Sequence, residues 1–122
     1  MITLPPPSKA TVDIILDHAP DFARLTARTS EREEQRALDS FIGVVYATDF
    51  MMPFDWMAEF AGKHNELTDI TVLSNADAAM LRKLLIANLR LDRFSTGHLE
   101  QLLRSGYLEA ALDRLRALFA VP

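Results

Sequence analysis

The stretch that says most about the fold is ADAAMLRKLLIANLRLDRFSTG, residues 76–97. Apolar side chains recur in it every three or four positions, the spacing that places them on one face of an α-helix. We therefore expect a helix from Ala76 to about Leu91, with Arg82, Lys83 and Arg90 off or beside its buried face. That buried face is predicted to hold Met80, Leu81, Leu84, Leu85, Asn88 and Leu91.

The chain then turns and continues as two shorter helices. Asp92 can accept hydrogen bonds from backbone amides or pair with a neighbouring arginine, and Phe94 can fill the corner between helices. Gly97 suits a positive φ or a close approach of two backbones. Thr96 is placed to cap a short helix that ends at Gly106, and a last helix is predicted beyond it. The apolar stripes of these two helices are Leu99, Leu102 and Leu103, then Leu108, Ala111, Leu112, Leu115 and Phe119.

The N-terminal part begins with an extended lead-in at residues 1–7, because consecutive prolines fix φ and donate no backbone hydrogen bond. Ser8 can cap the helix that follows. The apolar face of that helix holds Val12, Ile15 and Leu16. Pro20 ends this helix or begins the next segment, whose apolar side holds Phe22 and Leu25.

A second capped helix is predicted from about Ser30. Ser30 and Glu33 have the spacing of a capping box, which satisfies two backbone amides at a helix start. The stripe of this helix is Leu38, Phe41, Ile42 and Val45. Residues 41–46 could form a strand by their β-branched content, but the cap and the stripe outweigh it, so we expect helix to about Asp49.

The middle of the chain is predicted to be less regular. A short helix is expected over residues 54–61, ended by the glycine that follows. Residues 63–69 are predicted to form a loop, and residues 70–73 a short extended piece leading to a helix cap at Ser74 or Asn75.

These features predict one all-α domain over residues 1–122, a compact bundle of about five to six helices. A chain of 122 residues with 49% hydrophobic residues can bury a core without disulfides, and the absence of cysteine excludes thiolate chemistry. The net charge of −4 disfavours nucleic acid as a partner. We find no pattern typical of a signal peptide and no apolar run near the ~18 residues that cross a bilayer. We therefore expect a cytoplasmic protein without a membrane partner.

The three histidines are scattered along the sequence. His18, His64 and His98 lie on different segments, and none has a second metal ligand three or four positions away. We predict no metal and no cofactor.

A catalytic interpretation would pair Asp55 or Asp92 with His64 or His98 as acid and base. An anionic substrate would then be held by Arg90 and Arg93. No nucleophile motif or phosphate-binding loop supports this interpretation. An enzyme, or a small-molecule binder with a site near these residues, stays an alternative, and the sequence favours a non-catalytic protein without catalytic residues.

The aromatic and methionine-rich stretch at residues 50–60 suggests a contact surface. Such a stripe is more often core, but this one holds more large apolar groups than a short helix can bury. Its candidates for a protein interface are Trp56, Met57 and Phe60. We therefore favour a helical protein that binds another protein, as a regulator, an immunity protein or a phage-type inhibitor. A homodimer is possible, and residues 96–119 leave open a nucleic-acid-binding regulator with a helix-turn-helix-like segment.

Residues 90–94, 97–99 and 105–106 read RLDRF, GHL and SG, and they resemble the C-terminal signature R-x-D-R-F-x-x-G-x-L of an uncharacterised family of short bacterial helical proteins. That family is known as a domain of unknown function. The stretch FDW at residues 54–56 is similar to an aromatic-acidic patch of the same family. The resemblance implies a small helical fold, and it brings no reaction, cofactor or partner. The matching positions are Asp55, Trp56, Arg90, Asp92, Arg93 and Gly97.

Overall fold

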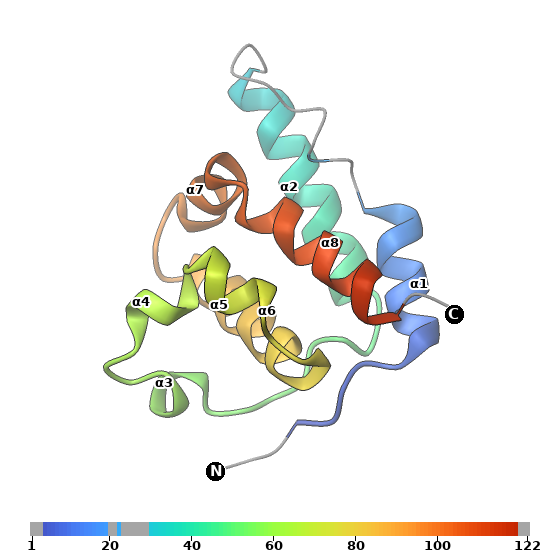
Figure 1. Ribbon diagram of the computed structural model, residues 1–122. Helices are drawn as coiled ribbons and strands as arrows, with labels where there is room; N and C mark the ends of the chain where they lie inside the picture. Colours follow the sequence, from blue (N-terminus) through green and yellow to red (C-terminus); the bar gives the residue numbers. More distant parts are fainter. Residues whose placement is uncertain (1–3, 20–21, 23–29, 120–122) are drawn as a thin grey trace.

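The computed structural model describes residues 4–19, 22 and 30–119, and in these ranges the protein is all-α (Figure 1). No strand occurs in them, which confirms the predicted fold class. Eight helices lie in the described ranges, more than the five to six expected, because three of them are only four or five residues long. They are α1 (Lys9–His18), α2 (Glu31–Tyr46), α3 (Trp56–Glu59), α4 (His64–Leu67), α5 (Ile70–Ser74), α6 (Ala78–Asp92), α7 (His98–Ser105) and α8 (Tyr107–Phe119).

Helices α6 and α8 form the centre of the molecule. Helix α6 packs against α3, α4, α7 and α8, and α8 packs in addition against α1 and α5. Helix α2 lies along α1 and also contacts α7 (Figure 1). None of the helices described is long and apolar enough to cross a membrane.

The surroundings of α6 correct the prediction for its faces. Residues 81–89 are all buried, so Arg82 and Lys83, which were expected off or beside the buried face, lie inside the protein. Met80, which was expected in the core, is 37% exposed. The amphipathic pattern assumed one buried face, whereas α6 is covered on several sides by other elements.

Both buried cations of α6 have partners that no local pattern could supply. The guanidinium of Arg82 donates to three backbone carbonyls: Nε to Phe50 at 2.8 Å, Nη1 to Pro5 at 3.1 Å, and Nη2 to Asp49. It thereby ties the lead-in and the turn after α2 to the central helix. Lys83 forms an ion pair with Glu59 of α3 at 2.8 Å.

The two N-terminal helices begin where the sequence predicts. The Ser8 hydroxyl accepts a hydrogen bond from the Thr11 amide, and the Ser30 hydroxyl accepts one from the Glu33 amide, each at 3.2 Å. The described part of the lead-in, residues 4–7, has no regular secondary structure, as expected. The predicted segment after Pro20, with Leu25, lies outside the described residues apart from Phe22, which packs edge-on against Phe41.

Helix α2 ends at Tyr46, before the predicted end at Asp49. The Thr48 side chain ends it early, because its hydroxyl donates to the Val45 carbonyl and accepts from the Phe50 amide. Residues 41–46 are helical, so the strand alternative is wrong. Of the predicted stripe, Leu38, Phe41 and Val45 are buried and Ile42 is half-buried.

Residues 54–75 are more helical than predicted. The expected helix over 54–61 is reduced to α3, and the expected loop at 63–69 contains α4. The expected extended piece at 70–73 is part of α5, because Asp69 caps it by accepting from the Thr71 amide at 2.8 Å.

The cap of α6 also differs from the predicted Ser74 or Asn75. Asp77 takes this role, and its carboxylate accepts from the Met80 amide at 2.8 Å. Helix α7 ends as predicted at Gly106, which has φ of +85°.

Candidate functional site

The turn between α6 and α7 is held in one conformation by two features. Gly97 has φ of +82°, a left-handed conformation that favours glycine, so of its two expected roles the structure shows the positive φ and no close approach. The Asp92 carboxylate accepts a hydrogen bond from the Leu99 amide at 3.0 Å. Asp92 thus caps α7 from the end of α6, and Thr96, the predicted cap, does not, because Gly97 occupies the cap position.

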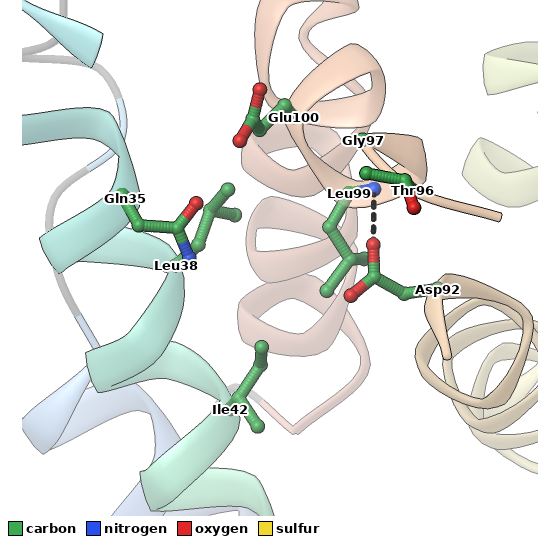
Figure 2. A pocket seen from close by; sticks show the side chains of 8 residues that line it. All are labelled: Gln35, Leu38, Ile42, Asp92, Thr96, Gly97, Leu99 and Glu100. Carbon is green, nitrogen blue, oxygen red and sulfur yellow. Dashed lines mark hydrogen bonds between the residues drawn. The ribbon is translucent and has the colours of Figure 1, made fainter. Parts of the chain in front are cut away.

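A hollow of about 240 Å³ lies between this turn and α2 (Figure 2). A second hollow of about 250 Å³ shares Ile42 and Asp92 with the first. We call the two together the α2–turn groove. The first hollow is lined by Gln35, Leu38, Ile42, Asp92, Thr96, Gly97, Leu99 and Glu100, and the second by Ile42, Gly43, Tyr46, Leu89, Asp92 and Arg93.

The first hollow combines apolar walls with carboxylates. Leu38 and Leu99 supply buried apolar surface from opposite sides. One oxygen of Asp92 holds the Leu99 amide, and Figure 2 shows the other directed toward α2. Glu100 stands at the rim near Gln35 (Figure 2). This end of the groove is therefore acidic, since its lining holds two carboxylates and no Lys or Arg.

The second hollow ends in exposed aromatic and cationic side chains. The Arg93 guanidinium lies over the Tyr46 ring at 5.9 Å from the centroid. Phe94, the next residue, is 72% exposed, so the expectation that it fills a corner between helices is wrong. Phe94 therefore lies exposed on a turn that the Asp92–Leu99 hydrogen bond holds in place.

Within the described chain, the remaining sequence candidates lie outside the groove. Asp55 is the N-cap of α3 and accepts from the Ala58 amide at 3.1 Å. Trp56 is half-buried, Met57 is 56% exposed, and Phe60 is buried at 5%. Arg90 is half-buried and lines neither hollow.

His98 belongs to a buried polar network. Its Nε2 lies 2.8 Å from the Asn88 Oδ1, and the Asn88 amide nitrogen donates to the Leu67 and Leu84 carbonyls and to the Tyr107 hydroxyl. Because the Asn88 oxygen must accept, the His98 Nε2 donates. The network joins α4, α6, α7 and α8, and it shows that Asn88 is a core residue with partners.

Burial controls the protonation of this network. It lowers the pKa of His98, and the nearby Asp92 carboxylate offsets that shift only in part. Burial also raises the pKa of the Tyr107 hydroxyl above its ordinary value, so it stays protonated. A neutral His98 that donates its Nε2 proton to Asn88 is a structural group and is poorly placed to exchange protons with a substrate.

The other two histidines lie on different helices. His18 lies in the last turn of α1, and the side chain of His64 falls outside the described part of the structure. Among the side chains described, no group of three or more His, Asp or Glu residues could hold a metal ion.

The model of a family of unknown function, DUF6508, matches residues 26–121. The chain belongs to this family. No match to it is found among curated proteins or solved structures. The DUF6508 region contains α2 through α8 and therefore both walls of the α2–turn groove, whereas α1 lies outside it.

Of the positions implied by the family resemblance, the fold brings Asp92, Arg93 and Gly97 together in the α2–turn groove and leaves Asp55, Trp56 and Arg90 elsewhere. The sequence does not predict the α2 wall of the groove, with Leu38, Ile42 and Tyr46, as part of a site, because in the sequence these residues are ordinary members of a helical stripe.

Proposed function

We propose that this protein is a non-catalytic helical module that binds another protein through the α2–turn groove and the adjacent Phe94 ring. A regulator, an immunity protein or a phage-type inhibitor in the bacterial cytoplasm would use such a surface. The R-x-D-R-F-x-x-G-x-L signature would then describe the turn that builds it.

The observation that carries the proposal is the exposed Phe94 on a fixed turn. An aromatic ring gives a large contact area, and aromatic residues dominate the binding energy of many interfaces. The turn is fixed by the Asp92–Leu99 hydrogen bond and by Gly97, so binding would order few additional groups. Phe94 also follows Arg93, which lies on Tyr46, and all three side chains can meet one partner.

The local contacts favour binding over catalysis. Asp55 and Asp92, the candidate acids, serve as helix caps, and His98 is bound to Asn88. Asp92 lies near His98, but each already holds a hydrogen bond that serves the fold.

The nucleic-acid alternative receives less support from the packing of α8. This helix contacts α1, α5, α6 and α7, so its apolar face, with Tyr107, Leu108, Ala111, Leu112 and Leu115, is buried in the protein. Its exposed charged side chains are Glu109, Asp113 and Arg116, a poor set for contacts with phosphates.

The test is capture of partners from native lysate, with and without nuclease treatment, by tagged wild type, Phe94→Ala and Ile14→Ala, read by mass spectrometry. Ile14 is a matched control because it is 46% exposed on α1, away from the groove. We expect a protein that wild type and Ile14→Ala retain and that Phe94→Ala loses. Equal retention by Phe94→Ala would refute the proposed surface, and a partner that disappears with nuclease treatment would favour the nucleic-acid alternative.

A further inference from the structure

The acidic end of the groove carries information about the partner. Asp92 and Glu100 line the first hollow, and within the described chain neither carboxylate forms an ion pair. We propose that this end receives a Lys or Arg side chain of the partner, flanked there by apolar residues. This inference rests on the proposed function and specifies its ligand.

The nearby cations of the chain are engaged elsewhere. Arg104, one turn after Glu100, binds Glu34 with nitrogen–oxygen distances of 3.3 and 3.4 Å. Arg93 lies on the Tyr46 ring at the other end of the groove. Arg104 is close enough to Glu100 for their charges to interact, but in the described chain neither Glu100 nor Asp92 forms an ion pair, so both carboxylates can still accept a cationic side chain.

A helix N-terminus favours anions, and α7 begins at this hollow. Here that preference is already met, because the Asp92 carboxylate accepts from the Leu99 amide. Beyond that bond the hollow presents the second oxygen of Asp92 and the carboxylate of Glu100 (Figure 2). A second anion would meet like charge, whereas a cation would meet opposite charge.

The size and the walls of the hollow fit one side chain. Its volume of about 240 Å³ lies below the range of roughly 300–1,000 Å³ that holds drug-sized ligands. Leu38, Ile42 and Leu99 can cover the methylene groups of a Lys or Arg whose charged end reaches the carboxylates. The proposed occupant is a partner and not a second copy of this chain, because a dimer with the groove on its two-fold axis would bring like carboxylates together.

The probe is the peptide acetyl-Leu-Arg-Leu-amide, with acetyl-Leu-citrulline-Leu-amide as its uncharged isostere. Binding is followed by the amide signals of Ile42, Gly97 and Leu99 in a nuclear magnetic resonance titration of the full chain. We expect these signals to shift with the arginine peptide, and the citrulline peptide to bind about 1.5- to 5-fold more weakly, or more, since each accessible ion pair supplies such a factor.

Two variants locate the effect. Glu100→Gln removes one carboxylate of the hollow and leaves the Asp92 cap in place, and Glu109→Gln removes an exposed carboxylate of α8 with the same change of net charge. We expect Glu100→Gln to weaken the arginine peptide by about 1.5- to 5-fold and to leave the citrulline peptide unchanged. Glu109→Gln should change neither.

The inference is overturned if the two peptides bind equally, if both variants weaken the arginine peptide equally, or if the shifted amides lie outside the groove. The capture experiment tests the proposed function separately and uses no peptide. In that experiment, a partner that Phe94→Ala still retains would refute the proposed surface.

Discussion

Replacement of Gly97 by alanine isolates the backbone conformation of the turn as a contribution to stability. Gly97 has φ of +82°, and a Cβ added there would have no atom within 4 Å. The substitution therefore introduces no clash, and its whole effect comes from placing an L-residue in the left-handed region. That conformation disfavours an alanine by about 1–2 kcal/mol. For a chain of this size, the melting temperature should fall by roughly 4–8 °C.

Gly43 provides the matched control within the same groove. It lies inside α2, and a Cβ added there also has no atom within 4 Å. Gly43→Ala should stabilise the protein by about 0.5–1 kcal/mol, because alanine favours a helix interior over glycine. The same chemical change is thus expected to have opposite signs at the two positions.

The assay is urea unfolding followed by circular dichroism, with the slope against urea checked to be unchanged. Gly97→Asn should lose less stability than Gly97→Ala, since asparagine tolerates the left-handed region better. Gly97→Val should lose about 1–3 kcal/mol. The requirement for positive φ would be refuted if Gly97→Ala were as stable as wild type, or if Gly97→Asn were less stable than Gly97→Ala.

Three further predictions concern the buried polar groups. Asn88→Ala removes the hydrogen-bond partner of the Leu67 carbonyl, the Tyr107 hydroxyl and His98. It should reduce the free energy of unfolding by about 2–4 kcal/mol in urea titrations. A loss below about 1 kcal/mol would mean that water replaces the amide. Because burial lowers the folded-state pKa of His98, the unfolded chain binds a proton first as the pH falls, so the free energy of unfolding should decrease from pH 7 through the ordinary histidine value of about 6.5. His98→Gln should flatten that decrease, and an unchanged slope would contradict the assignment. Arg82→Lys keeps the charge, but one ammonium cannot replace three guanidinium contacts, so thermal unfolding should show a loss of about 1–3 kcal/mol, and an unchanged melting temperature would show that the contacts contribute little.

The parts of the fold that the sequence predicts correctly depend on neighbours within one helical turn. Ser8 and Ser30 cap amides three residues ahead, Gly97 has the positive φ that was one of its expected roles, and Gly106 ends α7. Such features need no knowledge of the rest of the chain, because the cap and its amide are brought together by the helix itself.

The errors occur where distant segments decide the outcome. Arg82 is buried because its partners, 32 to 77 residues away in the sequence, surround it with carbonyls. A helical pattern assigns such a residue to the surface, since unpaired charge is rarely buried. Phe94 differs in the opposite direction: a large ring predicts burial, but the side chain is exposed on a turn that the Asp92–Leu99 hydrogen bond holds in place.

The groove could not be predicted for the same reason, and this bears on how the protein works. Its walls come from α2 and from a turn some fifty residues later, so it exists only when α2 and α7 are packed. Asp92 serves both the turn and the groove. Its one oxygen fixes the turn, a role that serine or asparagine could also fill, while the other adds a negative charge to the hollow. A carboxylate at this position therefore couples the geometry of the turn to the charge of the groove. Phe94 and Glu100 form no such bond within the described chain, so substitutions there are expected to change the proposed binding without changing the fold.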